Sequence, residues 1–154
     1  MRAVVQRVLN ASVSVDNNTV GSCKKGFLIL VCAENGDTEF DAEILASKIA
    51  KLRIFSDLND KMNLSIIDVG GEVLSISQFT LCADVKKGNR PSFANAMEPI
   101  GAENLYELFC KKLSESGIKS VQKGIFGADM KVSLVNDGPV TVILDTKIWR
   151  KYEN

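Results

Sequence analysis

Short apolar runs separated by turn residues are the feature of this 154-residue sequence that most limits its fold. Val and Ile are frequent in these runs, as is typical of strands. Four runs follow one another in the first third of the chain, at residues 2–8, 11–16, 19–23 and 26–33, with a turn at Asn17-Asn18. The first third of the chain therefore predicts a series of strands.

Two segments carry a helical period instead. Residues 38–51 place their apolar side chains on one stripe, and Thr38 with Asp41 has the spacing of a capping box. Residues 102–116 form a second stripe, and Gly117 suits the position just after a helix ends. The apolar positions of the two stripes are Phe40, Ile44, Leu45, Ile49, Leu105, Leu108, Phe109 and Leu113.

Strand patterns return in the rest of the chain, at residues 52–56, at 72–81, around Val121, around Val132 and at 139–145. Residues 61–72 and 82–93 are polar and predict loops. Strands therefore outnumber helices, and most connections are short. We predict a single α+β domain over residues 1–154, with mainly antiparallel strands and two principal helices.

Composition narrows the chemistry that is open to the chain. Nineteen basic and 19 acidic residues cancel, so no overall field attracts nucleic acid and any RNA contact needs a local patch. The sequence has no histidine, which excludes Ser-His and Cys-His nucleophile systems, histidine general bases and histidine-ligated zinc. Chemistry is left to hydroxyls, carboxylates, lysines, backbone dipoles or the substrate itself.

The first residues, the longest apolar run and the cysteines indicate the cell compartment of the protein. The first residues lack the apolar stretch of a signal peptide, and the longest apolar run, residues 27–33, is too short to span a bilayer. The four cysteines show no Cys-x-x-Cys pair and lie in apolar surroundings, at Cys23, Cys32, Cys82 and Cys110. We expect reduced, mostly buried thiols in a cytoplasmic protein, with no metal, no other cofactor and no membrane contact.

One late stretch departs from the strand pattern. Residues 134–144 read "LVNDGPVTVIL", in which Asn-Asp-Gly-Pro interrupts two strand-like runs. A hairpin turn is the simplest interpretation, because these are turn residues. However, Pro139 follows Gly138 at once and removes an N–H group where the return strand would begin to pair. The stretch is therefore a candidate for a role of its backbone carbonyls.

Three stretches stand out: "SQFTL" at residues 77–81, "KKGNRPSF" at 86–93 and "FGADMKVSLVNDGPVT" at 126–141. Alone, each has an ordinary explanation as a strand end, a solvated loop or core packing. Together with "VVQRV", "RIFSD" and "KMNLS", they resemble the D-aminoacyl-tRNA deacylase family, in order and at compatible spacing over nearly the whole chain. Residues 146–154 match no motif of that family and are expected to form a variable tail.

This resemblance implies a homodimeric cytosolic enzyme with the fold of that family, built on mainly antiparallel sheets or a barrel-like β core. It implies hydrolysis of the ester between a D-amino acid and the terminal adenosine of tRNA. Gly138 and Pro139 would form a cis peptide bond that reaches into the partner subunit's pocket. The wall of the pocket would carry Ser77, Gln78, Phe79 and Thr80.

An enzyme that accepts amino acids with many side chains but rejects one configuration at Cα can select the configuration through its own backbone groups. Carbonyls around Gly138-Pro139 would hold the α-ammonium group and leave no room for a side chain on the L face. Steric exclusion of this kind can discriminate more strongly than tuned attraction. Because such a gate tests only what projects from Cα, glycyl-tRNA is an expected second substrate.

Two mechanisms remain open for the hydrolysis. Thr80 matches a hydroxyl assigned as nucleophile in the family, but it has no evident base, and a free hydroxyl is a weak nucleophile at neutral pH. We therefore favour assistance by the free ribose hydroxyl over a covalent intermediate on Thr80. Backbone N–H groups near Phe79 and Thr80 would stabilise the oxyanion, at about 3–4 kcal/mol for one good donor.

Two further sets of residues have a functional and an ordinary interpretation. Phe126, Gly127 and Met130 match "FGADM" and would form an adenine-binding wall, or else Met130 is core packing. Basic residues would contact tRNA phosphates or simply be solvated, and Arg7 would brace the active-site region. The basic residues concerned are Lys86, Lys87 and Arg90.

Two other functions compete with this one. Editing of a mischarged L-amino acid, as in the related domain of some threonyl-tRNA synthetases, would select by side chain and not by configuration. A non-catalytic module that binds the end of RNA would bind charged tRNA without cleaving its ester.

Overall fold

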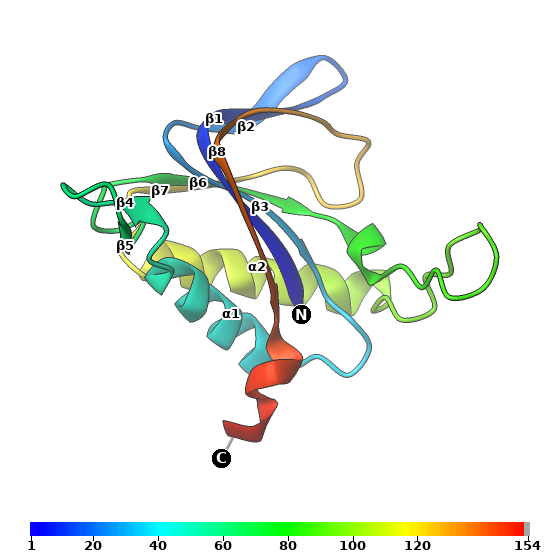
Figure 1. Ribbon diagram of the computed structural model, residues 1–154. Coiled ribbons are helices and arrows are strands. Elements are labelled where there is room, and N and C mark those ends of the chain that lie inside the picture. Colours follow the sequence, from blue (N-terminus) through cyan, green and yellow to red (C-terminus); the bar gives the residue numbers. More distant parts are fainter. Residues whose placement is uncertain (153–154) are drawn as a thin grey trace.

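A computed structural model describes residues 1–152 as a six-stranded sheet, a two-stranded ribbon and two long helices (Figure 1). The strands are β1 (Arg2–Val15), β2 (Asn18–Cys23), β3 (Gly26–Cys32), β4 (Phe55–Ser56), β5 (Met62–Leu64), β6 (Glu72–Ser77), β7 (Ser120–Lys123) and β8 (Lys131–Asp145). The helices are α1 (Glu39–Lys51) and α2 (Pro99–Glu115), with 3₁₀ turns η1 (Phe79–Cys82) and η2 (Thr146–Tyr152). None of the helices among these residues is both long and apolar enough to cross a bilayer.

The sheet has the order β2-β1-β3-β6-β7, with β8 paired to β1. Strand β1 is antiparallel to β2, β3 and β8, in line with the mainly antiparallel strands predicted for the domain. Strands β3 and β6 pair parallel, as do β6 and β7. Parallel neighbours need a crossover connection, and α1 and α2 lie in those two connections. The predicted α+β class with two principal helices is confirmed.

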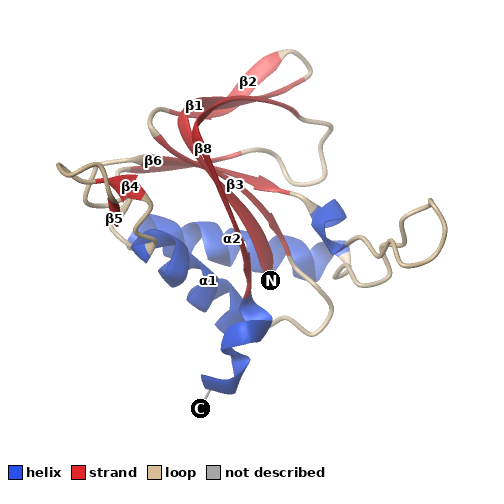
Figure 2. Ribbon diagram, in the orientation of Figure 1, coloured by secondary structure: helices blue, strands red, loops and turns tan. Residues whose placement is uncertain are grey.

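Figure 2 shows the strands as a curved sheet beside the two long helices. The two ends of its strand order, β2 and β7, approach each other. The backbone N–H of Ser22 in β2 donates to Oε1 of Gln122 in β7 at 2.8 Å. A Cβ atom on Gly21 would lie 2.6 Å from the carbonyl oxygen of Lys123, so only glycine allows this approach of the two strands. The result is the barrel-like β core that the family resemblance implied.

Two strands are longer than predicted, because each of them joins two of the predicted strands. The runs predicted at residues 2–8 and 11–16 fall in one strand, β1, which ends at Val15, and the runs on either side of Gly138-Pro139 form one strand, β8. The hairpin interpretation of residues 136–139 is therefore wrong. Between the pairs Gln6–Thr141 and Val8–Asn136, Arg7 alone faces residues 137–140. A bulge in a long strand absorbs the turn residues without reversing the chain.

Both faces of the central strands are buried. Helices α1 and α2 cover one face, where Phe27, Ile29 and Val73 contribute to the larger core (Figure 1). Leu28 and Leu74 point to a second core inside the curled sheet. Burial on both faces explains why residues 26–32 are an unbroken apolar run without alternation. All four cysteines are buried and unlinked, as expected.

Several element boundaries differ from those predicted. The strand expected at 72–81 ends at Ser77, and the segment predicted to be a loop at 61–72 contains β5. Helix α2 begins at Pro99 instead of residue 102, because the Glu98 side chain accepts hydrogen bonds from the N–H groups of Ile100 and Gly101. The capping box of Thr38 and Asp41 at the start of α1 is confirmed.

The segment after residue 145 is integrated into the fold. Turn η2 lies against α1, and Trp149 packs on the larger core. The Arg150 guanidinium forms ion pairs with Asp37 and Asp41, whose carboxylates are almost fully buried. Thr146 is fully buried and donates to Asp41. Sequence analysis assigned no role to these residues.

Candidate active site

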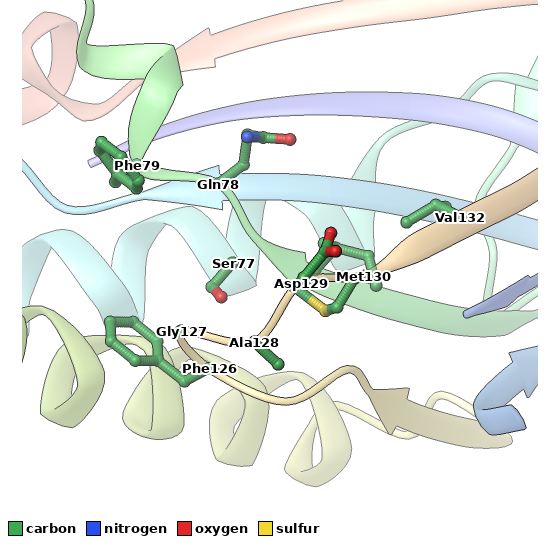
Figure 3. A pocket seen from close by; sticks show the side chains of 10 residues that line it. Ser77, Gln78, Phe79, Phe126, Gly127, Ala128, Asp129, Met130 and Val132 are labelled. Carbon is green, nitrogen blue, oxygen red and sulfur yellow. The ribbon is translucent and has the colours of Figure 1, made fainter. Parts of the chain in front are cut away.

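An open cleft lies where β6 leads into η1. It has a volume of about 260 Å³ and is lined by the end of β6 and by the segment that leads into β8 (Figure 3). The lining residues are Ile76, Ser77, Gln78, Phe79, Phe126, Gly127, Ala128, Asp129, Met130 and Val132. Small-molecule sites commonly measure about 300–1,000 Å³, so this cleft alone is slightly too small to enclose a large ligand.

The fold brings two separate sequence stretches together in this cleft. Ser77, Gln78 and Phe79 come from "SQFTL", whereas the opposite wall comes from "FGADM". The predicted residues that meet here are Ser77, Gln78, Phe79, Phe126, Gly127 and Met130.

The β6 side of the cleft is fixed by backbone hydrogen bonds. The N–H of Gln78 donates to the carbonyl of Val31 at 2.8 Å, which extends the parallel pairing of β3 and β6 by one residue. Arg2 Nη1 donates to the carbonyl of Leu81 at 2.8 Å and holds η1 in place. The first N–H groups of a helical turn have no partner within it. Phe79 and Thr80 are the first two residues of η1, so their N–H groups have no acceptor within that turn.

Thr80 does not share the position of Ser77, Gln78 and Phe79 in the wall of the cleft. Its side chain is exposed and does not line the cleft. Within the described part of the chain, its hydroxyl accepts a hydrogen bond from Gln78 Nε2 at 2.6 Å and is hydrogen-bonded to no carboxylate or amine. The geometry therefore offers no base for activating Thr80.

The other wall is a turn stabilised by glycine and packing. Gly127 has φ +77°, and an added Cβ there would meet no atom within 4 Å, so conformation and not space favours glycine. Ala128 N–H donates to the carbonyl of Ile125 at 3.2 Å. Met130 packs over Gly124, where a Cβ would lie 2.5 Å from its sulfur. Met130 therefore both lines the cleft and packs against the second core.

Helix α2 supports both walls from behind. The ring of Tyr106 lies against Phe126 with a centroid distance of 6.1 Å. Its hydroxyl donates to the carbonyl of Ser75 at 2.8 Å, and burial raises the pKa of Tyr106 far above its ordinary value. The phenol therefore stays protonated and keeps this donor bond. Gly124 N–H also donates to the carbonyl of Ser75, at 3.1 Å, so one residue of β6 positions both supports.

Gly138 and Pro139 do not lie in the cleft of their own chain. Their peptide bond is cis, as the family resemblance implied, and both residues are exposed on β8. Gly138 has φ +129°, and a Cβ there would lie 2.9 Å from Val140 Cγ2 and 3.1 Å from Arg7 Nη2. This position therefore requires glycine.

Arg7 connects the bulge to the rest of the fold. Its side chain is largely buried, Nε donates to the carbonyl of Asp137 at 3.0 Å, and Nη1 donates to the carbonyl of Ile54 at 2.7 Å. A carboxylate oxygen of Asp137 lies 3.6 Å from the same Nε. Arg7 thus braces the residue before Gly138 and does not itself reach the cleft.

The predicted basic residues lie on the loop between η1 and α2, which projects away from the sheet (Figure 1). Lys86, Lys87 and Arg90 are exposed. Among residues 1–152, their side chains form no ion pair or hydrogen bond. Three uncompensated charges in five residues make this loop a local positive patch on a chain with no net charge.

One other cluster has donors at the spacing of metal ligands. The side chains of Cys32, Glu34 and Cys82 gather within 4.8 Å, and the two sulfur atoms are 2.7 Å apart. Arg2 and Lys147 already pair with Glu34, at 3.2 and 2.5 Å. Burial raises the pKa of both thiols, which keeps them protonated, whereas a metal would need thiolates. The donors therefore fit a packed core better than a metal site.

The arrangement favours recognition and oxyanion stabilisation over acid–base chemistry. Apolar walls and backbone donors can hold a flat base and a polarised carbonyl, while Ser77 adds a hydroxyl. Asp129 and Ala128 also line the cleft and were not singled out, although both belong to "FGADM". Asp129 is exposed and pairs with Lys131 at 3.0 Å.

Known proteins with similar sequences belong to the family that the sequence motifs resemble. The sequence profile of the family described as D-Tyr-tRNA(Tyr) deacylase matches residues 4–145. The D-aminoacyl-tRNA deacylase of Lacticaseibacillus casei (strain BL23) is 54% identical over 147 residues, which is 96% of this chain and 99% of that protein.

Solved structures share the fold. A structure titled "c-Myc DNA Unwinding Element Binding Protein" has a TM-score of 0.89 at 39% identity and covers 94% of this chain and 98% of its own. One titled "Structural Analysis of a probable eukaryotic D-amino acid tRNA deacylase" has a TM-score of 0.81 at 16% identity, with the same coverage, and is similar in fold alone. The profile match and the 54% identity across nearly the whole chain show that this chain belongs to the D-aminoacyl-tRNA deacylase family.

Proposed function

We propose that this protein is a hydrolase that cleaves the ester of D-aminoacyl-tRNA to free tRNA and a D-amino acid, and so removes the wrong enantiomer before translation. The observation that carries the proposal is the meeting of "SQFTL" and "FGADM" in one cleft, in a chain 54% identical to a protein of that name. The terminal adenosine would bind between Phe79 and the Phe126–Met130 turn. Such an activity belongs in the cytoplasm, where tRNA is charged.

Selection of configuration is assigned to Gly138 and Pro139 of a partner subunit. Both residues are exposed on β8 and absent from the lining of their own cleft, which supports action on another copy of the chain. The small volume of the cleft supports the same arrangement, because a second surface would complete it. Arg7 would hold the carbonyl of Asp137 while the gate excludes a side chain on the L face.

The same gate makes glycyl-tRNA a second substrate. Glycine has no side chain on either face, so steric exclusion at Cα cannot reject it. The proposed unit is a homodimer of single-domain chains over residues 1–154.

Hydrolysis would be assisted by the substrate. Thr80 has no base beside its hydroxyl, so the free ribose hydroxyl would position or activate the water. The N–H groups of Phe79 and Thr80 would stabilise the developing oxyanion. Lys86, Lys87 and Arg90 would engage phosphates, which predicts a slope of about −3 in log affinity against log salt if three contacts form.

The deciding experiment compares deacylation of D-tyrosyl-tRNA, L-tyrosyl-tRNA and glycyl-tRNA under identical conditions with catalytic amounts of enzyme. We expect rapid loss of the D and glycyl esters and retention of the L ester. The Thr80→Ala variant should keep most of its turnover. Cleavage of the L ester would contradict the gate, and loss of turnover in folded Thr80→Ala would contradict substrate assistance.

Two other functions remain as outcomes of the same assay. Discrimination by side chain and not by configuration would indicate editing of mischarged L-amino acids. Binding of charged tRNA with no cleavage of any ester would indicate a non-catalytic RNA-end module.

A further inference from the structure

Two exposed aromatic rings meet at the edge of the cleft. Phe79 and Phe93 are 59% and 39% exposed, and their centroids lie 5.2 Å apart at an interplanar angle of 72°. Phe79 lines the cleft, whereas Phe93 lies outside it. An edge-to-face pair leaves ring surface open to solvent, and apolar surface that is exposed in a contiguous patch commonly marks a binding site.

The backbone around Phe93 is fixed on both sides, so its exposure is built into the fold. Ser92 and Asp84 exchange two backbone hydrogen bonds of 2.8 and 2.9 Å, which close the neck of the projecting loop. After Phe93, Asn35 Nδ2 donates to the carbonyl of Ala94 at 2.9 Å. Asn35 N–H donates to the carbonyl of Asn95 at 2.9 Å.

The charge on the loop that leads to Phe93 indicates the class of ligand. The closed neck places the loop that carries Lys86, Lys87 and Arg90 directly after η1 and directly before Phe93. Aromatic side chains next to uncompensated cations are the usual means of binding single-stranded nucleic acid, since bases stack on rings while phosphates meet the charges.

We propose that Phe79 and Phe93 form a stacking platform for the unpaired nucleotide that precedes the terminal adenosine of the RNA. This inference rests on the proposed function, which puts that adenosine in the cleft lined by Phe79. A nucleotide one step back along the strand then leaves the cleft on the Phe79 side and meets Phe93. Its phosphate faces the basic loop.

The test measures binding of an uncharged RNA minihelix with a single-stranded 3′ end. A second RNA has an abasic site immediately before its terminal adenosine. Both are titrated against the wild-type protein and the variants Phe93→Ala, Phe93→Leu, Phe93→Trp and Leu58→Ala. Leu58 is fully exposed in a distant turn and is the matched control for loss of an exposed apolar side chain.

We expect Phe93→Ala and Phe93→Leu to weaken binding of the intact RNA about 5- to 150-fold, the usual cost of losing one base–aromatic stack. Phe93→Trp and Leu58→Ala should bind as the wild type does. The abasic RNA should bind the wild type as weakly as the intact RNA binds Phe93→Ala. The abasic RNA should bind Phe93→Ala no more weakly than it binds the wild type, because the protein change and the RNA change remove the same stack.

Additive losses would overturn the platform, since ring and base would then act independently. Loss of the dimer in Phe93→Ala, seen by sedimentation, would overturn it in favour of a protein interface. Wild-type cleavage of D-tyrosyl-tRNA, measured in parallel, separates the two proposals. If the wild type cleaves D-tyrosyl-tRNA but the losses of RNA affinity are additive, the platform alone is ruled out. If the wild type neither cleaves D-tyrosyl-tRNA nor binds RNA, both the platform and the proposed function are ruled out.

Discussion

Among single residues, Gly138 is the position where an added Cβ atom should disturb the proposed gate most. Its φ of +129° is rarely adopted by other residues, and a Cβ would lie 3.0 Å from the backbone nitrogen of Val140. The same Cβ would press on the Arg7 guanidinium that holds Asp137. The side chain would therefore displace the carbonyls assigned to the gate.

We expect Gly138→Ala to lower kcat/KM for D-tyrosyl-tRNA at least tenfold, or about 1.4 kcal/mol in transition-state stabilisation. Gly36→Ala is the control, because Gly36 also has a positive φ but no atom within 4 Å of an added Cβ. Chemical denaturation of both variants separates backbone strain, about 1–3 kcal/mol, from loss of catalysis. Equal activity of the two variants would contradict the role of Gly138.

At the scale of elements, α1 and η2 are joined by a buried charge cluster. Burial of Asp41 would by itself raise the pKa of its carboxyl, but bonds from Thr146 and Thr38 and the charges of the Met1 ammonium and Arg150 outweigh this and lower it. A lowered pKa in the folded state means that the stabilisation is present above the ordinary value of 3.8 and is lost as pH falls through the lower, folded-state value.

We expect Arg150→Met to reduce the free energy of unfolding by about 1–3 kcal/mol, less than for a fully buried pair because Arg150 is partly exposed. Its stability should also fall less steeply than that of the wild type below about pH 4, since Asp41 is then less perturbed. Lys111→Met removes an exposed pair with Glu115 and should change stability by under about 0.5 kcal/mol. Urea titrations across pH measure both effects, and identical pH profiles would disprove the coupling.

At the scale of the whole molecule, a gate that acts on a partner predicts complementation. A homodimer would have a mass of twice 16.8 kDa, or 33.6 kDa. Gly138→Val blocks the gate, and Ala128→Trp fills the cleft. A mixed dimer combines one intact cleft with one intact gate. After random reassociation, half of the dimers are mixed and one site in two works, so about a quarter of wild-type activity should return.

Light scattering measures the mass, and deacylation of D-tyrosyl-tRNA measures the recovery against each variant alone at the same total concentration. Monomeric mass, or no recovery on mixing, would place the gate and the cleft in one chain and contradict the proposal.

Features that depend on near neighbours in the chain could be predicted from the sequence. The strand and helix periods, the capping box at Thr38 and Asp41, and the buried state of the cysteines follow from side chains two to four positions apart, whose environment a local pattern reflects. The ordered motifs from "VVQRV" to "NDGPVT" were also sufficient to identify the family.

Features that depend on residues far apart in the chain became visible only in the folded structure. Residues 136–139 carry turn signals, yet β1 continues alongside them, and Arg7 holds the bulge inside β8. Phe79 meets Phe93, and Arg150 meets Asp37, through contacts that no periodicity encodes. Gly138 and Pro139 lie outside their own cleft because the path of β8 along β1 places them there. Pairing between strands far apart in the chain therefore determined which conformation these local segments adopt.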